Sequence, residues 1–257
     1  MLKDEYEELR KTVEAFSRDV VAPVIGDFYE REAFPYDIVR QMGAMGLFGL
    51  PFPEEYGGMG GDYFALCVAL EELARVDSSV SITLEAAVSL GAMPIFRFGT
   101  KEQREHWLPR LTSGAELGAF GLTEPGGGTD VPGGMRTTAV LDGAEWVING
   151  TKAFITNSGT DITAVVGVAA LTGEREISTI LVPSGTPGFT VSKKYSRSAG
   201  TPPTPASCPS PTAASPPRTS WVSAAAATPS SCRRSTRAAS RSPPSAWGWR
   251  RGAWTSA

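Results

Sequence analysis

Acidic residues are missing from the last quarter of this chain of 257 residues. All 27 Asp and Glu lie in residues 1–197, whereas residues 198–257 carry seven Arg and no Lys. The same 60 residues lack Leu, Ile, Phe, Tyr and Met, and Ser, Ala, Pro, Thr and Arg fill 50 of their positions. A segment without large apolar side chains cannot offset the entropy of ordering its backbone. We therefore expect residues 198–257 to be disordered and the globular part to end at residue 197.

Cysteine and histidine are almost absent from the globular part. Cys67 is its only cysteine and His106 the only histidine of the chain, which excludes a disulfide framework and a thiolate or His-rich metal site. No apolar run has the length of a membrane span, and the N-terminus lacks the pattern of a signal peptide. We expect a soluble, cytoplasmic protein without a metal or a membrane partner. His106, next to Trp107 in a charged stretch, is expected to be partly exposed and not catalytic.

Residues 1–116 are expected to form an all-α domain. Apolar residues recur there at spacings of three and four, which is the pattern of amphipathic helices. Asp37 is placed to cap one helix, and Thr100 with Gln103 has the spacing of a capping box that opens another. The expected helices carry Tyr6 to Val20, Ile38 to Met42, Leu66 to Leu73, Ser78 to Phe98 and Trp107 to Leu111.

From Leu117 onward the pattern changes to short runs rich in β-branched and aromatic residues. These runs are Leu117 to Thr123, Arg136 to Leu141, Glu145 to Ile148, Thr163 to Ala170, Ile177 to Val182 and Phe189 to Val191. Asp142-Gly143 and Asn149-Gly150 between them are typical hairpin turns. Helices followed by strands, without alternation, indicate an α+β fold. We expect a helical domain followed by an antiparallel, barrel-like β domain over residues 117–197.

A glycine-rich loop follows the first expected strand. After Thr123 the chain reads Glu-Pro-Gly-Gly-Gly, and then Thr129. Glycines let a backbone approach a ligand closely, and the N–H groups and Thr hydroxyls are donors suited to a phosphate. No Gly-x-Gly-x-x-Gly opens a helix here and no Gly-Lys-Ser/Thr follows, so neither common nucleotide fingerprint is present. By itself, such a loop is equally compatible with a plain turn.

Further motifs in the chain make the functional interpretation of this loop specific. Residues 146–157 read Trp-Val-Ile-Asn-Gly-Thr-Lys-Ala-Phe-Ile-Thr-Asn, and the helical part contains Gly-Leu-Phe-Gly-Leu-Pro at 46–51 and Pro-Glu-Glu-Tyr-Gly-Gly at 53–58. In this order the motifs resemble those of the acyl-CoA dehydrogenase family, from about Tyr6 to Tyr195. The resemblance implies that the helices and the β domain form one side of a cleft for FAD and an acyl-CoA thioester.

The resemblance also implies roles for residues of the glycine-rich loop. Backbone groups of Phe120, Leu122 and Thr123 would contact the isoalloxazine ring of FAD. Gly128 and Thr129 would belong to the cofactor-binding loop. Thr129 stands where the family usually has Ser, and it would reach the pyrophosphate or the thioester end of the substrate.

Three residues of the second motif would line the flavin. Phe154 stands where the family often has Trp and would pack against the flavin ring, with Ile155 and Thr156 beside its reactive N5 edge. A flavin requires a flat apolar wall and donors aimed at its ring heteroatoms, and these residue types supply both. The alternative is that Phe120 and Phe154 are aromatic residues of the sheet core.

The implied reaction is α,β-dehydrogenation of an acyl-CoA in fatty-acid or branched-chain catabolism. An electron-transfer flavoprotein-like acceptor and a homo-oligomer are implied for the intact family member. A carboxylate must remove the α-proton, and in the family this base is a Glu on a C-terminal helical domain that this chain lacks. No catalytic residue is therefore assigned, and the chain is expected to be inactive as written. Glu124, in the Thr-Glu-Pro turn, is expected to have a local structural role.

Residues 198–257 have the composition of GC-rich DNA translated out of frame. We tested this by shifting the reading frame. Each codon of the shifted frame then consists of the third base of one printed tail codon and the first two bases of the next. The genetic code then permits Leu-Gly-Trp-His-Ala-Ser-Asp-Thr over 197–205, and similar family-like stretches over 215–232 and 235–242. We therefore interpret the tail as the product of a frameshift, either in the gene or in its sequencing.

The alternative interpretation is a natural basic tail. The protein would then be a non-catalytic flavin- or acyl-CoA-binding protein whose tail contacts an acidic partner such as nucleic acid. The tail's Arg residues are interleaved with Pro and Ala and form no recognisable nucleic-acid-binding motif. We therefore expect no nucleic-acid partner.

Resequencing the coding DNA around the Arg197 codon separates these two interpretations. A sequencing error predicts that resequencing changes the frame at this codon, and mass spectrometry of the protein from its source should then find peptides that contain Leu-Gly-Trp-His-Ala-Ser-Asp-Thr. A frameshift in the gene itself leaves the DNA sequence and the printed tail peptides unchanged, and it is recognised by a shifted frame that stays open and encodes these family-like residues. A shifted frame that is interrupted by stop codons or lacks these residues would show that the tail is natural.

Overall fold

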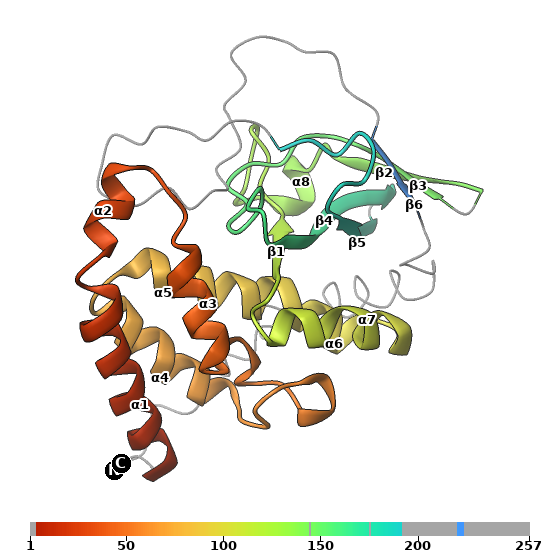
Figure 1. Ribbon diagram of the computed structural model, residues 1–257. Coiled ribbons are helices and arrows are strands. Elements are labelled where there is room, and N and C mark those ends of the chain that lie inside the picture. Colours follow the sequence, from red (N-terminus) through yellow and green to blue (C-terminus); the bar gives the residue numbers. More distant parts are fainter. Residues whose placement is uncertain (1–3, 144, 175, 192–219, 224–257) are drawn as a thin grey trace, which may run out of the picture.

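A computed structural model describes residues 4–143, 145–174, 176–191 and 220–223 of the chain (Figure 1). Its helices are α1 (Asp4–Phe16), α2 (Ile25–Glu30), α3 (Tyr36–Ala44), α4 (Tyr63–Ala74), α5 (Ser78–Glu85), α6 (Met93–Phe98), α7 (Lys101–Thr112) and α8 (Val131–Gly134). Its strands are β1 (Leu117–Gly121), β2 (Thr138–Asp142), β3 (Glu145–Asn149), β4 (Thr163–Gly173), β5 (Glu176–Pro183) and β6 (Ser220–Ser223). The helices α1 to α7 form one part and the strands another, which confirms the predicted α+β class.

Acidic and hydroxyl side chains start several of these helices. The capping box at Thr100 and Gln103 is present, as predicted. Asp77 accepts the N–H groups of two residues in the first turn of α5 and also the hydroxyl of Tyr29. The prediction that Asp37 caps a helix is wrong, because α3 begins one residue earlier at Tyr36. The Asp37 carboxylate instead pairs with Arg40 within the helix.

Residues Ser78–Phe98 form a continuous helical segment through the middle of the helical part. The π-helical turn η4 (Ala86–Ala92) joins α5 to α6. By length and composition this segment could cross a membrane, contrary to our expectation for the sequence, but 67% of its most apolar window is buried inside the protein. Extensive burial is typical of the core helix of a globular fold, and helices that are apolar on all sides occur there.

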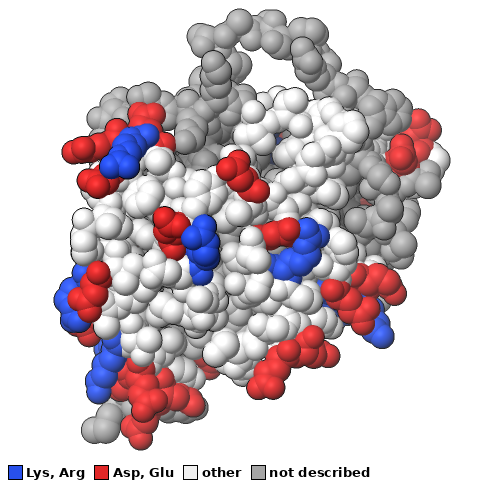
Figure 2. All heavy atoms as spheres, in the orientation of Figure 1, with Lys and Arg blue, Asp and Glu red and all other residues white. Residues whose placement is uncertain are grey.

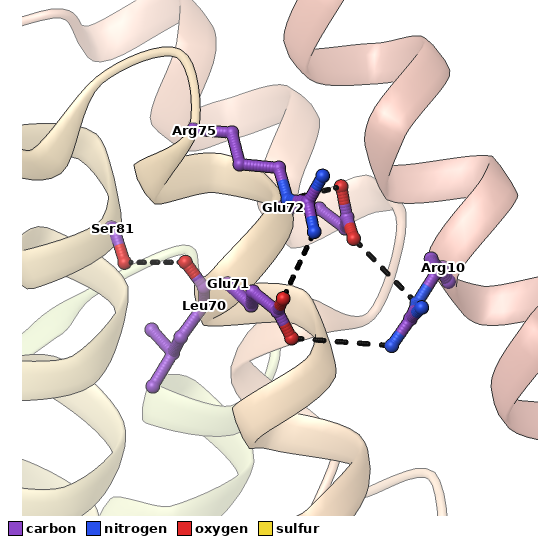
Figure 3. A network of polar contacts seen from close by, with 6 residues as sticks. All are labelled: Arg10, Leu70, Glu71, Glu72, Arg75 and Ser81. Carbon is purple, nitrogen blue, oxygen red and sulfur yellow. Dashed lines mark hydrogen bonds and ion pairs between the residues drawn. The ribbon is translucent and has the colours of Figure 1, made fainter. Parts of the chain in front are cut away.

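Ion pairs tie α1 to α4 at the edge of this helical core (Figure 3). Arg10 of α1 lies 3.6 Å from the buried carboxylate of Glu72 and 3.9 Å from that of Glu71. Arg75 pairs with the same two carboxylates at 3.4 and 3.0 Å. Ser81 of α5 donates to the Leu70 carbonyl and so links the next helix. The shared contacts fix the relative positions of α1, α4 and α5.

The sheet is mixed and open, and the prediction of an antiparallel, barrel-like domain is wrong in these respects. Its strand order is β1-β4-β2-β3-β6, with β5 paired to β4. β2 and β3 form the predicted hairpin around Asp142-Gly143. β1 and β2, however, run parallel to β4. Phe189 to Val191, predicted as a strand, is not one.

The parallel pairing has its origin at Asn149-Gly150. This dipeptide ends β3 without forming the predicted hairpin, and residues 150–162 then cross back toward the helices before β4 begins. β4 therefore enters the sheet from the same end as β1. Gly150 has a φ of 159°, and a side chain there would collide with Thr137. The glycine thus serves a close backbone approach and not the expected turn.

β6 lies within the segment that the composition predicted to be disordered. Ser220–Ser223 pairs antiparallel with β3, with Val222 opposite Trp146. The prediction that regular structure ends at residue 197 is therefore wrong for these four residues. A strand can pair through backbone groups alone, and β3 offers an edge whose N–H and C=O groups need partners. The remainder of the predicted tail lies outside the described residues.

The helical part and the sheet meet where two glycines face each other. A Cβ atom on Gly118 of β1 would lie 2.8 Å from the Gly91 Cα, and one on Gly91 would lie 2.7 Å from the Gly118 Cα. The backbones of η4 and β1 are therefore in direct contact. Asn157 adds a hydrogen bond of 2.9 Å from its Nδ2 to the Thr83 carbonyl of α5. These contacts hold the segments around β1 against the helices.

Replacement of Gly118 by Ala tests this close approach. The new methyl group would meet backbone atoms that cannot move independently, so we expect a loss of about 1–3 kcal/mol in the free energy of unfolding, as for overpacked cores. Urea denaturation followed by circular dichroism measures it. Gly126→Ala is the control, because nothing lies within 4 Å of a Cβ there. Equal midpoints for the two variants would contradict a tight contact.

Candidate functional site

The glycine-rich loop forms a compact turn at the end of β1. The Glu124 N–H donates to the Gly127 carbonyl at 2.9 Å, and the Gly127 N–H returns a bond of 3.0 Å to the Glu124 carbonyl. A Cβ atom on Gly128 would lie 3.1 Å from the Thr123 side chain, so the loop folds back over Thr123. Asp130 closes the loop by accepting the N–H of Gly133 in α8. The exposed glycines and Thr129 lie between these fixed points.

Glu124 anchors the glycine-rich loop to the interior of the protein. Its carboxylate is only 6% exposed and lies 2.8 Å from the ammonium of Lys152, which is 5% exposed. The same carboxylate accepts the backbone N–H groups of Arg136 at 2.6 Å and Thr137 at 2.8 Å. Three donors therefore surround one buried carboxylate. The structural role predicted for Glu124 is confirmed.

The environment of Glu124 keeps it ionised. Burial acts to raise the pKa of its carboxyl, but the hydrogen bonds from Lys152, Thr137 and Arg136 outweigh burial and hold this pKa below its usual value. Burial lowers the pKa of the Lys152 ammonium, and the facing carboxylate opposes that effect. A fully engaged carboxylate with a lowered pKa is a poor general base.

The second motif lies directly against the first. Lys152 also donates to the Leu122 carbonyl at 3.1 Å, and the Ala153 N–H donates to the Thr123 carbonyl at 2.8 Å. Residues 122–124 and 152–153 are therefore joined by three hydrogen bonds, although some thirty residues separate them in the chain. Lys152 had no role in the sequence analysis, because a single lysine in a short apolar stretch carries no signal of burial.

Phe154 is the most unusual residue of the second motif. Its φ is 57°, in the left-handed region that bulky residues rarely adopt, and its side chain is 63% exposed. Strained backbones persist only where surrounding structure holds them, and they are frequent at ligand sites. The bonds of Lys152 and Ala153 on one side, and of Asn157 with its φ of 65° on the other, provide that support.

The other predicted site residues differ in their exposure. Ile155 is buried in the core of the sheet, so only its backbone can face a ligand. Phe120 is half-buried and its ring lies across Gly167 of β4. Leu122, Thr123 and Thr156 are half-buried, whereas Gly128 and Thr129 are exposed. The roles that the resemblance gave to these eight residues remain predictions.

The arrangement suits a flavin in two respects. An exposed aromatic ring on a rigid backbone offers a flat apolar wall, and the adjacent glycine-rich loop offers N–H and hydroxyl donors. Among the described residues, no three His, Cys, Asp or Glu are grouped to hold a metal ion. His106 is exposed, in keeping with the expected surface position, and its ring lies edge-on to Trp107.

Comparison with known proteins identifies the family. Residues 3–115 match the acyl-CoA dehydrogenase N-terminal domain, and residues 119–209 match the acyl-CoA dehydrogenase middle domain. The chain belongs to the acyl-CoA dehydrogenase family. Its relatives are FAD-dependent oxidoreductases, and the two matched models correspond to the helical part and the sheet.

Individual relatives support this assignment. The Bacillus subtilis protein named probable acyl-CoA dehydrogenase YngJ is 42% identical over 201 residues, which cover 76% of this chain and 52% of the relative. The butyryl-CoA dehydrogenase structure from Megasphaera elsdenii superimposes with a TM-score of 0.74 at 32% identity, covering 90% of this chain and 58% of that one. A glutaryl-CoA dehydrogenase from Mycobacterium smegmatis in complex with FADH2 gives 0.75 at 30% identity, covering 92% and 60%. This chain spans about half the length of the curated relatives it matches.

Replacing Glu124 by Gln tests the buried ion pair. The change leaves the Lys152 charge without its partner, so we expect a loss of about 3–5 kcal/mol in unfolding free energy at pH 7. Because the pKa of Glu124 is lowered on folding, its stabilisation is present above the unfolded pKa of about 4.3 and is lost as pH falls through the lower folded pKa. The difference from the original chain should therefore shrink below about pH 4.

Urea denaturation at several pH values measures this difference. The control is Asp37→Asn, which removes a pair whose two side chains are each 75% exposed and should change stability little. A stability difference for Glu124→Gln that stays constant down to pH 3 would show that the ionised carboxylate is not the stabilising species.

Proposed function

We propose that this chain supplies the flavin-binding side of an acyl-CoA dehydrogenase. The observation that carries the proposal is the junction of the two motifs: Glu124 and Lys152 bring the glycine-rich loop against the segment that presents Phe154. Two separate stretches with ligand-binding features are thereby joined into one surface. Membership of the family and a solved relative that holds FADH2 support the same proposal.

The residues of this surface divide into a wall and a set of donors. The Phe154 ring would lie against the isoalloxazine, and the Asn157 bond to Thr83 helps to hold the backbone segment that carries this ring. Thr123, Thr129 and Thr156 would donate to the cofactor or to the thioester end of the substrate. When bound, FAD would accept the hydride from the β-carbon of the acyl chain. The protein's contribution is to orient both ligands and to exclude water.

Proton abstraction requires a carboxylate, and the two carboxylates of the glycine-rich loop have structural roles. Glu124 is buried and bonded to three donors, and Asp130 accepts the N–H of Gly133. Glu124 is thus fully engaged, and Asp130 serves to cap α8. We therefore propose that the printed chain does not oxidise acyl-CoA, and that the base lies on a domain encoded by the restored frame.

The acceptor and assembly of the intact protein follow from the same proposal. An electron-transferring flavoprotein-like acceptor would reoxidise the flavin, and a homo-oligomer would complete the site.

On the face that Figure 2 shows, the Lys and Arg side chains (blue) lie next to Asp and Glu side chains (red) and do not form a patch of one sign. A basic surface for nucleic acid is therefore not present on that face.

Parallel purification of the printed chain and of a frame-corrected chain tests the function. We expect the printed chain to lose FAD during gel filtration and to show no acyl-CoA oxidation with an artificial acceptor, since general base catalysis alone contributes about 10² to 10⁴ in rate. The corrected chain should be yellow and active. Flavin absorbance and dye reduction measure both properties.

Two results would contradict the proposal in different ways. Activity of the printed chain that survives removal of host dehydrogenases would show that a base is present in it. A corrected chain that folds but stays colourless would show that these motifs do not bind a flavin.

A further inference from the structure

We propose that Lys152 is a positioning residue that fixes the direction of the Thr123 N–H, so that this N–H serves as a preoriented donor to the flavin. The inference rests on the proposed function, because it assigns a task to one residue of the same surface. It differs from a stabilising role for the Glu124–Lys152 ion pair, since it depends on a second contact of the ammonium group. That contact is the bond to the Leu122 carbonyl.

The geometry of one peptide unit carries the argument. The Leu122 carbonyl and the Thr123 N–H belong to the same peptide bond, which is planar and trans, so the two groups point in opposite directions. Lys152 Nζ holds the carbonyl oxygen at 3.1 Å from inside the protein, where the lysine is only 5% exposed. The Thr123 N–H must therefore point away from the buried ammonium group.

The Thr123 N–H is available to a ligand. In the part of the chain that the structure describes, this N–H donates to no acceptor, and Thr123 itself is only half-buried. Its own carbonyl is occupied by the Ala153 N–H at 2.8 Å, so the peptide units on both sides of Thr123 are held. A half-buried N–H without an acceptor is costly unless water or a ligand satisfies it.

Lys152 also strengthens the donor that it orients. A cation at the carbonyl end of a peptide polarises the group, and the N–H at the other end becomes a better donor, as in chains of hydrogen bonds. The ion pair with Glu124 keeps the lysine in place without leaving a net charge beneath the site. One ammonium group thus serves two acceptors, and only the bond to Leu122 affects the Thr123 N–H.

Two single variants separate these contacts. Lys152→Met keeps the length of the side chain but loses both bonds. Glu124→Gln loses the ion pair, yet it leaves Lys152 able to donate to the Leu122 carbonyl. The control is Glu72→Gln, which removes a carboxylate that is 3% exposed and paired with Arg10 and Arg75 in the helical part. All three changes should lower stability, so stability alone does not discriminate between them.

Titration of the full printed chain with FAD provides the first measurement. Flavin fluorescence quenching gives the dissociation constant, and the visible absorbance of bound flavin reports its hydrogen bonds. We expect Lys152→Met to weaken binding about tenfold, the loss of about one oriented hydrogen bond. Its bound-flavin spectrum should also shift. Glu124→Gln should weaken binding less than about threefold with an unchanged spectrum, and Glu72→Gln should have no effect beyond stability.

Amide hydrogen exchange without flavin provides the second measurement. If Lys152 holds the Leu122–Thr123 peptide, its loss should loosen Thr123 and weaken the bond from the Ala153 N–H to the Thr123 carbonyl, so that this N–H exchanges faster. After correction for global stability, we expect exchange at least about tenfold faster in Lys152→Met than in Glu124→Gln. Equal rates in the two variants would overturn the inference.

The two measurements distinguish failure of the inference from failure of the function. If the original chain binds no FAD at any accessible concentration while the exchange pattern appears, the peptide is held as inferred and the flavin proposal for this chain fails. If FAD binds and both variants weaken it equally, the flavin proposal stands and the positioning role of Lys152 is wrong. If Lys152→Met does not fold, Glu124→Gln decides, because a loss of affinity above tenfold in that variant contradicts the inference.

Discussion

The buried ion pair between Glu124 and Lys152 is the interaction on which the candidate site depends. It joins two segments that lie far apart in the sequence, and each partner also bonds to backbone groups of the other segment or of its neighbour. Breaking such a pair leaves an uncompensated buried charge. The glycine-rich loop and the strained backbone at Phe154 can therefore be exposed to solvent, because the residues that precede them in the chain are fixed by these buried bonds.

A second constraint is the contact between Gly91 and Gly118, which brings a helix and a strand together without intervening side chains. β1 is thereby held against η4 immediately before it leads into the loop at Thr123. The Asn157 bond to Thr83 repeats this connection on the other motif. Both motifs are thus tied to the helical part as well as to each other, which limits their relative motion.

The segments that follow β2 and β3 explain why local sequence patterns predicted the strands of the sheet but not how they pair. Asp142-Gly143 formed the expected hairpin, because that turn is determined by residues adjacent in sequence. Asn149-Gly150 has the same kind of composition, yet Thr137 leaves space only for glycine at position 150, and the chain continues without a hairpin. β6 formed through backbone pairing with an available edge, a possibility that side-chain composition does not reveal.

The sequence by itself determined the α+β class, most helices, the family and the stretches that form the candidate site. These features follow from periodicity and from motifs whose residues are close together in the chain. Only the tertiary structure decided the parallel pairing of β1 with β4, the burial of Lys152 and the left-handed backbone of Phe154. Each depends on a partner many residues away: Thr163 to Val168 for β1, Glu124 for Lys152 and Thr83 for the segment that supports Phe154. The strand pairing, the burial and the backbone conformation are thus fixed by packing between distant segments, which no local sequence pattern encodes.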